Sequence, residues 1–114
     1  MTTQTHADHD ALAKALRDRV LDRPGESDRA LRQAAAQRSA SGPAMAEPYD
    51  VLVREIGEAS YRVTDAQVAS VLQAAGSEKA AFEIIAAAAV GAGLLRWQQA
   101  VKALNEAKDA PAGN

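Results

Sequence analysis

Residues 61–104 read YRVTDAQVASVLQAAGSEKAAFEIIAAAAVGAGLLRWQQAVKAL, and this stretch decides the fold. Thr64 is followed three residues later by Gln67, which is the spacing of a capping box, where each side chain bonds the other residue's backbone N–H. Gly76 stands where a helix would end, because glycine adopts the left-handed conformation of a C-terminal cap without a steric penalty. The stretch therefore predicts a short helix between Thr64 and Gly76.

A longer helix is predicted from Glu78 to about Glu106, because Ser77 can cap its start and no proline occurs before Pro111. At 1.5 Å per residue it would be about 43 Å long. A helix that is apolar nearly all round is expected to be buried nearly all round. Its apolar residues fall on two faces, the first with Phe82, Ile85, Ala89, Gly93, Trp97, Ala100, Val101 and Leu104, the second with Ile84, Ala88, Gly91 and Leu95.

Two glycines, Gly91 and Gly93, lie inside this long helix. Each costs about 1 kcal/mol relative to alanine. They predict that a neighbouring backbone approaches the helix there, since only small side chains allow such an approach. A phosphate-binding glycine loop is the alternative, but the sequence lacks the preceding strand and the further glycines of that motif.

The residues before this stretch predict three more helices. Residues 10–22 place Leu12, Leu16 and Val20 on one face, and Pro24-Gly25 ends that helix. Residues 26–38 predict a weaker helix that Ser27 can cap. Its apolar stripe is narrow, so we expect it on the surface or against a neighbouring subunit. Residues 48–61 predict an amphipathic helix with one face aimed at the core.

The domain organisation follows from these elements. We expect a mobile N-terminus over residues 1–9 and a helical arm with a linker over residues 10–47. Residues 48–107 form the predicted compact core, and residues 108–114 form a flexible tail. The fold class is therefore all-α, a bundle of about five helices with a long Ala-rich C-terminal helix that is buried in an oligomer.

The composition supports both halves of that prediction. Hydrophobic residues make up 47% of the 114 residues and aromatic residues only 4%. Alanine supplies a large share of the hydrophobic residues. Alanine favours helix because it loses no side-chain entropy. An Ala-rich core buries little area per residue, and burial stabilises by only about 25 cal/mol per Å². The chain therefore predicts subunits that share a core.

Charge and cysteine content exclude several functions. The net charge is −2, and the arginines of residues 17–38 alternate with acidic residues, so this region predicts a solvated mixed-charge face and no nucleic-acid partner. The arginines concerned are Arg17, Arg19, Arg23, Arg29, Arg32 and Arg38. The chain has no cysteine, which excludes disulfides, thiolate metal sites and thiol catalysis.

The sequence gives no positive signal for a membrane, a metal or a cofactor. No signal peptide is visible, the apolar run from Ala80 to Leu95 is shorter than the roughly 20 residues of a spanning helix, and we expect a cytoplasmic protein. His6 and His9 have the spacing of two ligands on one helical face, but no third ligand is identifiable. We expect no metal and no cofactor.

Residues 60–105 resemble the alkylhydroperoxidase D / carboxymuconolactone decarboxylase-like superfamily. VASVLQAAG resembles the body of its motif helix, SEKAAFEII its acidic turn and hydrophobic-Glu pair at Phe82-Glu83, and AAAAVGAGLLRWQQAVKAL its long helix. The resemblance implies an all-α unit that assembles as a trimer or hexamer. On this alignment the two cysteines and the histidine of the family's redox motif fall on Tyr61, Thr64 and Val68, so the resemblance argues against peroxidase activity.

The remaining candidate site is an interhelix pocket formed by Tyr61, Glu83, Arg96 and Trp97. Glu83 is a candidate general acid or base if burial raises its pKa. The alternative is a structural ion pair of Glu83 with Arg54, Arg62 or Lys79, or a contact with the helix dipole. Trp97 is also a candidate for a subunit interface, together with other residues of the long helix: Ala89, Gly91 and Gly93.

Three functions are compatible with these features. The first is a non-catalytic, homo-oligomeric structural or binding protein. The second is a cofactor-independent decarboxylase-like enzyme with its pocket near Glu83 and Tyr61. The third is a module that binds a protein or a small-molecule ligand through its N-terminal arm. The absence of the redox motif's two cysteines and its histidine favours the first.

Overall fold

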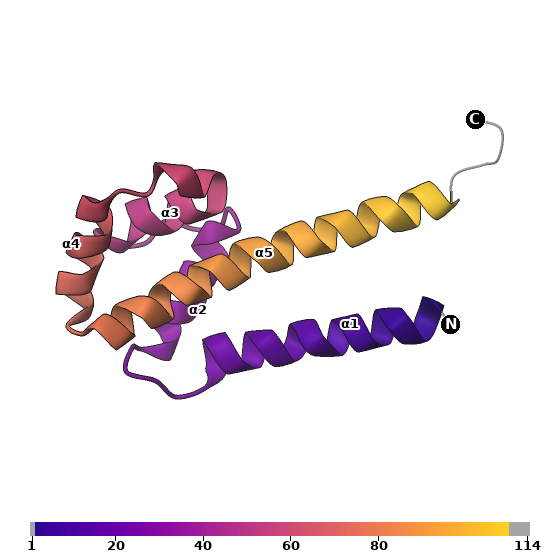
Figure 1. Cartoon of the computed structure of the whole chain (residues 1–114), viewed down its shortest axis with the longest axis horizontal. Helices are drawn as coiled ribbons and strands as arrows, with labels where there is room; N and C mark the ends of the chain where they lie inside the picture. The colour runs from indigo at the N-terminus through magenta and orange to yellow at the C-terminus, as the bar shows by residue number, and fades with distance from the viewer. Residues whose placement is uncertain (1, 110–114) are drawn as a thin grey trace.

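Five α-helices and two short helical turns build the part of the chain that the structure describes (Figure 1). The structure, a computed structural model, describes residues 2–109, with side chains from residue 8 onward. Within these residues the chain is all-helical, as predicted, and has no strand. The elements are α1 (Thr2–Arg17), the π-helical turn η1 (Asp18–Asp22), α2 (Arg29–Ser39), α3 (Tyr49–Ala59), the 3-10 turn η2 (Ser60–Arg62), α4 (Asp65–Ala75) and α5 (Glu78–Asp109).

Helix α2 lies at the centre of the molecule. Its main partner is α5, which crosses it, and its second partner is α3. Ala35 and Ala36 are buried there, and the core around them also contains Leu21, Val53, Ile84, Ala87 and Ala88. The expectation that this helix lies on the surface is therefore wrong. Small side chains do not keep it out of the core, because they let α5 approach closely.

A close backbone approach fixes the crossing of α2 and α5. A Cβ atom added at Gly91 would collide with the carbonyl oxygen of Ala36. The Ser39 hydroxyl, at the end of α2, donates to the Ala88 carbonyl oxygen of α5 at 2.6 Å. The prediction that a neighbouring backbone approaches Gly91 is confirmed. At Gly93 it is wrong within this chain, since nothing lies within 4 Å of an added Cβ.

The helix boundaries in the second half of the chain follow the predicted caps. Thr64 caps α4 in a complete capping box with Gln67, and Gly76 ends the helix with φ at 85°. The Ser77 hydroxyl accepts a hydrogen bond from the Ala80 N–H at 3.0 Å, as expected at the start of α5. A second, smaller core cluster joins α4 to α3 and α5 through Leu52, Val71 and Ala81.

The boundaries in the first half differ from the prediction. Helix α1 begins at Thr2, within the segment expected to be mobile, and η1 continues it to Asp22. Asp28, not Ser27, caps α2, and its carboxylate accepts from the Ala30 N–H. The predicted tail overlaps the end of α5 at Asp109, and residues 110–114 lie outside the described residues.

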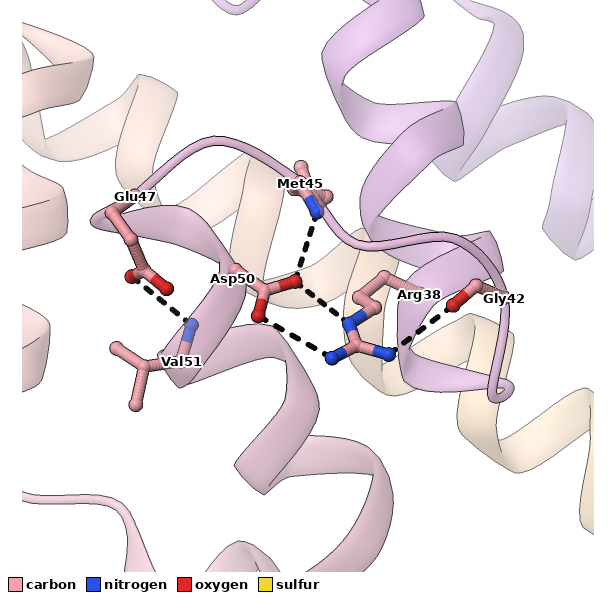
Figure 2. A network of polar contacts seen from close by, with 6 residues as sticks. All are labelled: Arg38, Gly42, Met45, Glu47, Asp50 and Val51. Atoms are coloured by element: carbon pink, nitrogen blue, oxygen red, sulfur yellow. Dashed lines mark hydrogen bonds and ion pairs between the residues drawn. The ribbon is translucent and has the colours of Figure 1, made fainter.

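The Asp50 carboxylate makes several of the contacts that hold the loop between α2 and α3, and the Glu47 carboxylate accepts from the Val51 N–H (Figure 2). Asp50 pairs with the Arg38 guanidinium, whose Nε lies 2.7 Å from Oδ1, and accepts from the Met45 N–H at 2.8 Å. Arg38 also donates to the Gly42 carbonyl oxygen at 3.2 Å. The Arg38 guanidinium and the Met45 N–H hold the pKa of Asp50 below its usual value. The segment predicted to be a linker is therefore tied to both flanking helices.

The molecule is elongated because α1 and the second half of α5 extend beyond the other helices (Figure 1). Its extents are 56 × 29 × 21 Å. The two helices run antiparallel away from the part that holds α2, α3 and α4, and α1 touches α5 only sparingly. We call α1 and residues 89–109 of α5 the helical extension.

Burial on α5 is one-sided. The buried residues are Ala80, Ala81, Ile84, Ala87, Ala88, Gly91, Ala92 and Leu94, whereas Phe82 is 68% exposed. The expectation of burial nearly all round is thus wrong for the isolated chain. Helix α5 is long and apolar enough to span a membrane by length and composition, contrary to the estimate from residues 80–95, but core helices of soluble proteins often share this property.

Candidate functional site

An apolar groove runs between α1 and α5 along the helical extension. It is open to solvent and has a volume of about 490 Å³. Helix α1 contributes residues at three- and four-residue steps, and α5 contributes residues at four-residue steps, so each helix lines the groove with one face. The lining residues are His9, Leu12, Ala13 and Leu16 on α1, and Ala89, Val90, Gly93, Leu94 and Trp97 on α5.

Three large side chains that line this groove are exposed, whereas Leu94 is buried. Leu12 is 68% exposed, Leu16 45% and Trp97 36%. The Trp97 ring meets the His9 ring edge to face, with 5.5 Å between the ring centroids. His9 and Trp97 are the lining residues closest to the N-terminus of α1 and to the C-terminus of α5, and part of the indole stays accessible. Exposed leucines in a continuous groove indicate a surface that another apolar chain can cover.

The structure separates the four residues of the predicted pocket. Tyr61 is 82% exposed on η2, where the Arg62 guanidinium lies 5.7 Å from its ring centroid. Arg96 donates to the Gly57 carbonyl oxygen of α3 at 2.6 Å, while its neighbour Trp97 faces α1. Glu83 faces the loop between η1 and α2. Each of the four therefore contacts a different part of the chain.

Glu83 is a structural anchor for the loop before α2. Its carboxylate accepts from the Ser27 hydroxyl at 2.7 Å, the Ser27 N–H at 2.8 Å and the Glu26 N–H at 3.2 Å. The bonds from Ser27, its hydroxyl first, hold the pKa of Glu83 below its usual value, which outweighs desolvation. A general acid at neutral pH needs the opposite shift. The predicted ion pair with Arg54, Arg62 or Lys79 is wrong, because backbone and hydroxyl donors take its place.

Arg32 completes the same anchor from the other side. It is 2% exposed, and its guanidinium donates to the carbonyl oxygens of Ser27, Arg23 and Leu21. It also donates to the Ser27 hydroxyl at 3.1 Å. A solvated role for this arginine is therefore wrong, since it satisfies carbonyl groups at the end of η1 and in the following loop.

The remaining site residues fall into two groups. Thr64 is a helix cap, and Val68 is 36% exposed on the outer face of α4. Of the four predicted interface residues, Ala89, Gly93 and Trp97 line the groove, and Gly91 is buried against α2 of its own chain. Among the described residues no cluster of three metal-ligating side chains exists.

The α1 side of the groove was not predicted as a site. The sequence shows its Leu12 and Leu16 stripe clearly, but the stripe has the period of any core-facing helix. Only the packing shows that these leucines remain exposed after the chain has folded.

The chain matches no family model, no curated protein and no solved structure. The similarity to the alkylhydroperoxidase D / carboxymuconolactone decarboxylase-like superfamily stays a prediction from the sequence.

Proposed function

We propose that the protein is a non-catalytic, homo-oligomeric assembly protein, and that a second copy covers the groove between α1 and α5. The observation that carries this proposal is the exposure of Leu12, Leu16 and Trp97 in one continuous groove. A second copy is the favoured occupant because the helical extension carries apolar side chains on both α1 and α5, so the same side chains of a second copy can pack against them. Buried apolar area stabilises by about 25 cal/mol per Å². An Ala-rich core buries little such area within one chain, so an interface with a second copy would add to it.

Two further features support the proposal. No atom of the described residues lies within 4 Å of a Cβ added at Gly93, so the backbone of a neighbouring helix can approach α5 there. The resemblance of residues 60–105 to a superfamily that assembles as trimers or hexamers favours the same role, and we propose an alkylhydroperoxidase-like origin for the fold on that basis. The missing cysteines leave no thiol for peroxidase chemistry.

Light scattering over a range of protein concentrations tests the proposal. The wild-type chain is expected at a multiple of 11.9 kDa. Leu16→Gln should shift the mass toward the monomer, because it places an amide in an interface that excludes water. Leu72→Gln on α4 is the matched control, since Leu72 is 39% exposed and Leu16 45%.

Trp97 provides a second readout, because it is the one tryptophan in the sequence and it lines the groove. Assembly should shift its fluorescence to shorter wavelength and reduce quenching by iodide. A wild-type chain that stays monomeric at the highest concentration and melts cooperatively would contradict the proposal. Equal effects of Leu16→Gln and Leu72→Gln would contradict the role of the groove.

A further inference from the structure

One face of the helix formed by α1 and the start of η1 carries an acidic residue near one end and a basic residue near the other. Two copies of this face placed antiparallel would therefore bring opposite charges together. Asp8 stands near one end, Arg19 stands near the other, and Ala11, Leu12, Ala15 and Leu16 lie between them at three- and four-residue steps. All six residues are exposed. We call them the α1 stripe. Leu12, Ala15, Leu16 and Arg19 share a surface hollow, which shows that the stripe is continuous in space.

Among residues 8–109 the charged ends of the stripe have no ionic partner. The ion pairs found among residues 8–109 are Arg29 with Asp22 and Arg38 with Asp50, and neither involves the stripe. Asp8 and Arg19 are therefore available to a second molecule.

Antiparallel pairing of two α1 stripes matches every position with a complementary one. If the two-fold axis passes midway between residues 13 and 14, Asp8 meets Arg19 of the second copy, and Arg19 meets Asp8. In the same register Leu12 faces Ala15 and Leu16 faces Ala11, so each large side chain meets a small one. Parallel pairing would instead oppose like charges at both ends.

We propose that two copies associate through antiparallel, two-fold pairing of their α1 stripes. This inference rests on the proposed assembly function and names the surface and orientation of the contact. The leucines of the stripe also line the groove beside α5, so the partner's α1 covers the groove as it pairs. A two-fold contact of this kind is isologous, so it builds dimers or even-numbered assemblies such as a hexamer of three dimers, and it excludes a simple cyclic trimer.

Charge reversal with restoration tests the orientation. Asp8→Arg and Arg19→Asp each turn both symmetric ion pairs into like-charge contacts, so each should weaken the dimer Kd about tenfold or more at low salt. The double variant D8R/R19D exchanges the two charges and should return the Kd to within about threefold of wild type. A parallel dimer would show no such weakening and restoration.

Matched controls separate the stripe from net charge. Asp10→Arg and Lys14→Asp make the same changes of net charge at exposed positions that lie off the stripe, and they should leave the Kd unchanged. The effects of the single variants should shrink as salt rises, because exposed ion pairs are screened. Circular dichroism checks folding, and restoration by the double variant excludes misfolding as the cause.

Cysteine cross-linking gives a second measurement, since the chain has no cysteine of its own. In the proposed register the two copies of position 8 lie about 16 Å apart along the helix axis, and the two copies of position 15 lie about 4–5 Å apart. Ala15→Cys should therefore form a disulfide-linked dimer, and Asp8→Cys should not, because a disulfide needs close Cα atoms. Parallel pairing would link both.

The outcomes distinguish this inference from the function on which it rests. A wild-type chain that stays monomeric overturns both. An oligomer whose Kd does not respond to Asp8→Arg or Arg19→Asp, or in which the double variant is as weak as the single variants, overturns only the α1 pairing. Cross-linking of Asp8→Cys to itself would do the same.

Discussion

At the scale of single residues, two glycines two positions apart in α5 have opposite surroundings. Gly91 lies against the Ala36 carbonyl of α2, and Gly93 faces open space in the groove. The sequence predicted a close neighbour at both, because glycine costs the same helix propensity at either position. Which of the two meets a backbone depends on the rotation of α5 about its axis, and packing sets that rotation.

Gly91→Ala and Gly93→Ala should therefore change stability in opposite directions. The Cβ added at Gly91 collides with backbone, so we expect a loss of about 1–3 kcal/mol or more in the free energy of unfolding. At Gly93 the added methyl meets nothing within 4 Å, and alanine should gain about 0.5–1 kcal/mol through helix propensity. Urea unfolding below the concentration at which the chain assembles measures both. Equal changes would show that α5 does not cross α2 at Gly91.

Glu83 should make stability depend on pH. Its folded pKa is lower than the ordinary value of 4.5, so the native state favours the ionised carboxylate. That contribution is fully present above about pH 4.5 and is lost as the pH falls through the lower folded pKa. Glu83→Gln should cost about 1–3 kcal/mol at pH 7 by weakening the bonds from Ser27 and Glu26.

The difference between wild type and Glu83→Gln should shrink as the pH is lowered toward 3. Thermal melts at a series of pH values measure it. Glu106→Gln, an exposed position on the same helix, is the control and should leave the acid dependence unchanged. A difference that is constant over this pH range would show that the Glu83 charge does not contribute.

At the scale of elements, α2 shows where sequence reasoning reached its limit. The caps of α4 and the start of α5 were predictable, because each depends on residues a few positions apart. The position of α2 was not, because its buried face consists of two alanines, one arginine and one serine. An arginine in a sequence predicts a solvent-exposed side chain unless carbonyl oxygens elsewhere accept hydrogen bonds from its guanidinium. Sequence spacing does not show that the carbonyl oxygens of Leu21 and Arg23 lie close enough to do so.

Arg32→Met should consequently destabilise the whole chain. Methionine has a similar length but no donors, and it leaves three buried or partly buried carbonyl groups without this partner. We expect a loss of about 3 kcal/mol in the free energy of unfolding. Arg29→Met is the matched control, because Arg29 lies on the same helix with a side chain that is 63% exposed. Chemical denaturation of both variants measures the difference, and similar losses would contradict the anchoring role of Arg32.

At the scale of the whole molecule, composition was sufficient for the fold class. High alanine content and helical spacing predicted an all-α chain of about five helices, and the structure confirms both. The groove was beyond the sequence, because an apolar stripe looks the same whether it meets its own core or a second copy. The stripe of Leu12 and Leu16 is such a case: α1 extends past the core, so those leucines stay exposed. The oligomeric state stays a prediction.

The crossing of α2 with α5 also sets the order in which the chain can fold during its synthesis. The Ser39 hydroxyl bonds a carbonyl group 49 residues further along, and most of the surface that covers α2 belongs to the last third of the chain. At about 5–20 residues per second, a ribosome needs roughly 2–10 s to supply that partner. Throughout this interval the nascent α2 carries an alanine face that α5 does not yet cover. We therefore expect a chain that is truncated before residue 88 to leave the alanine face of α2 uncovered.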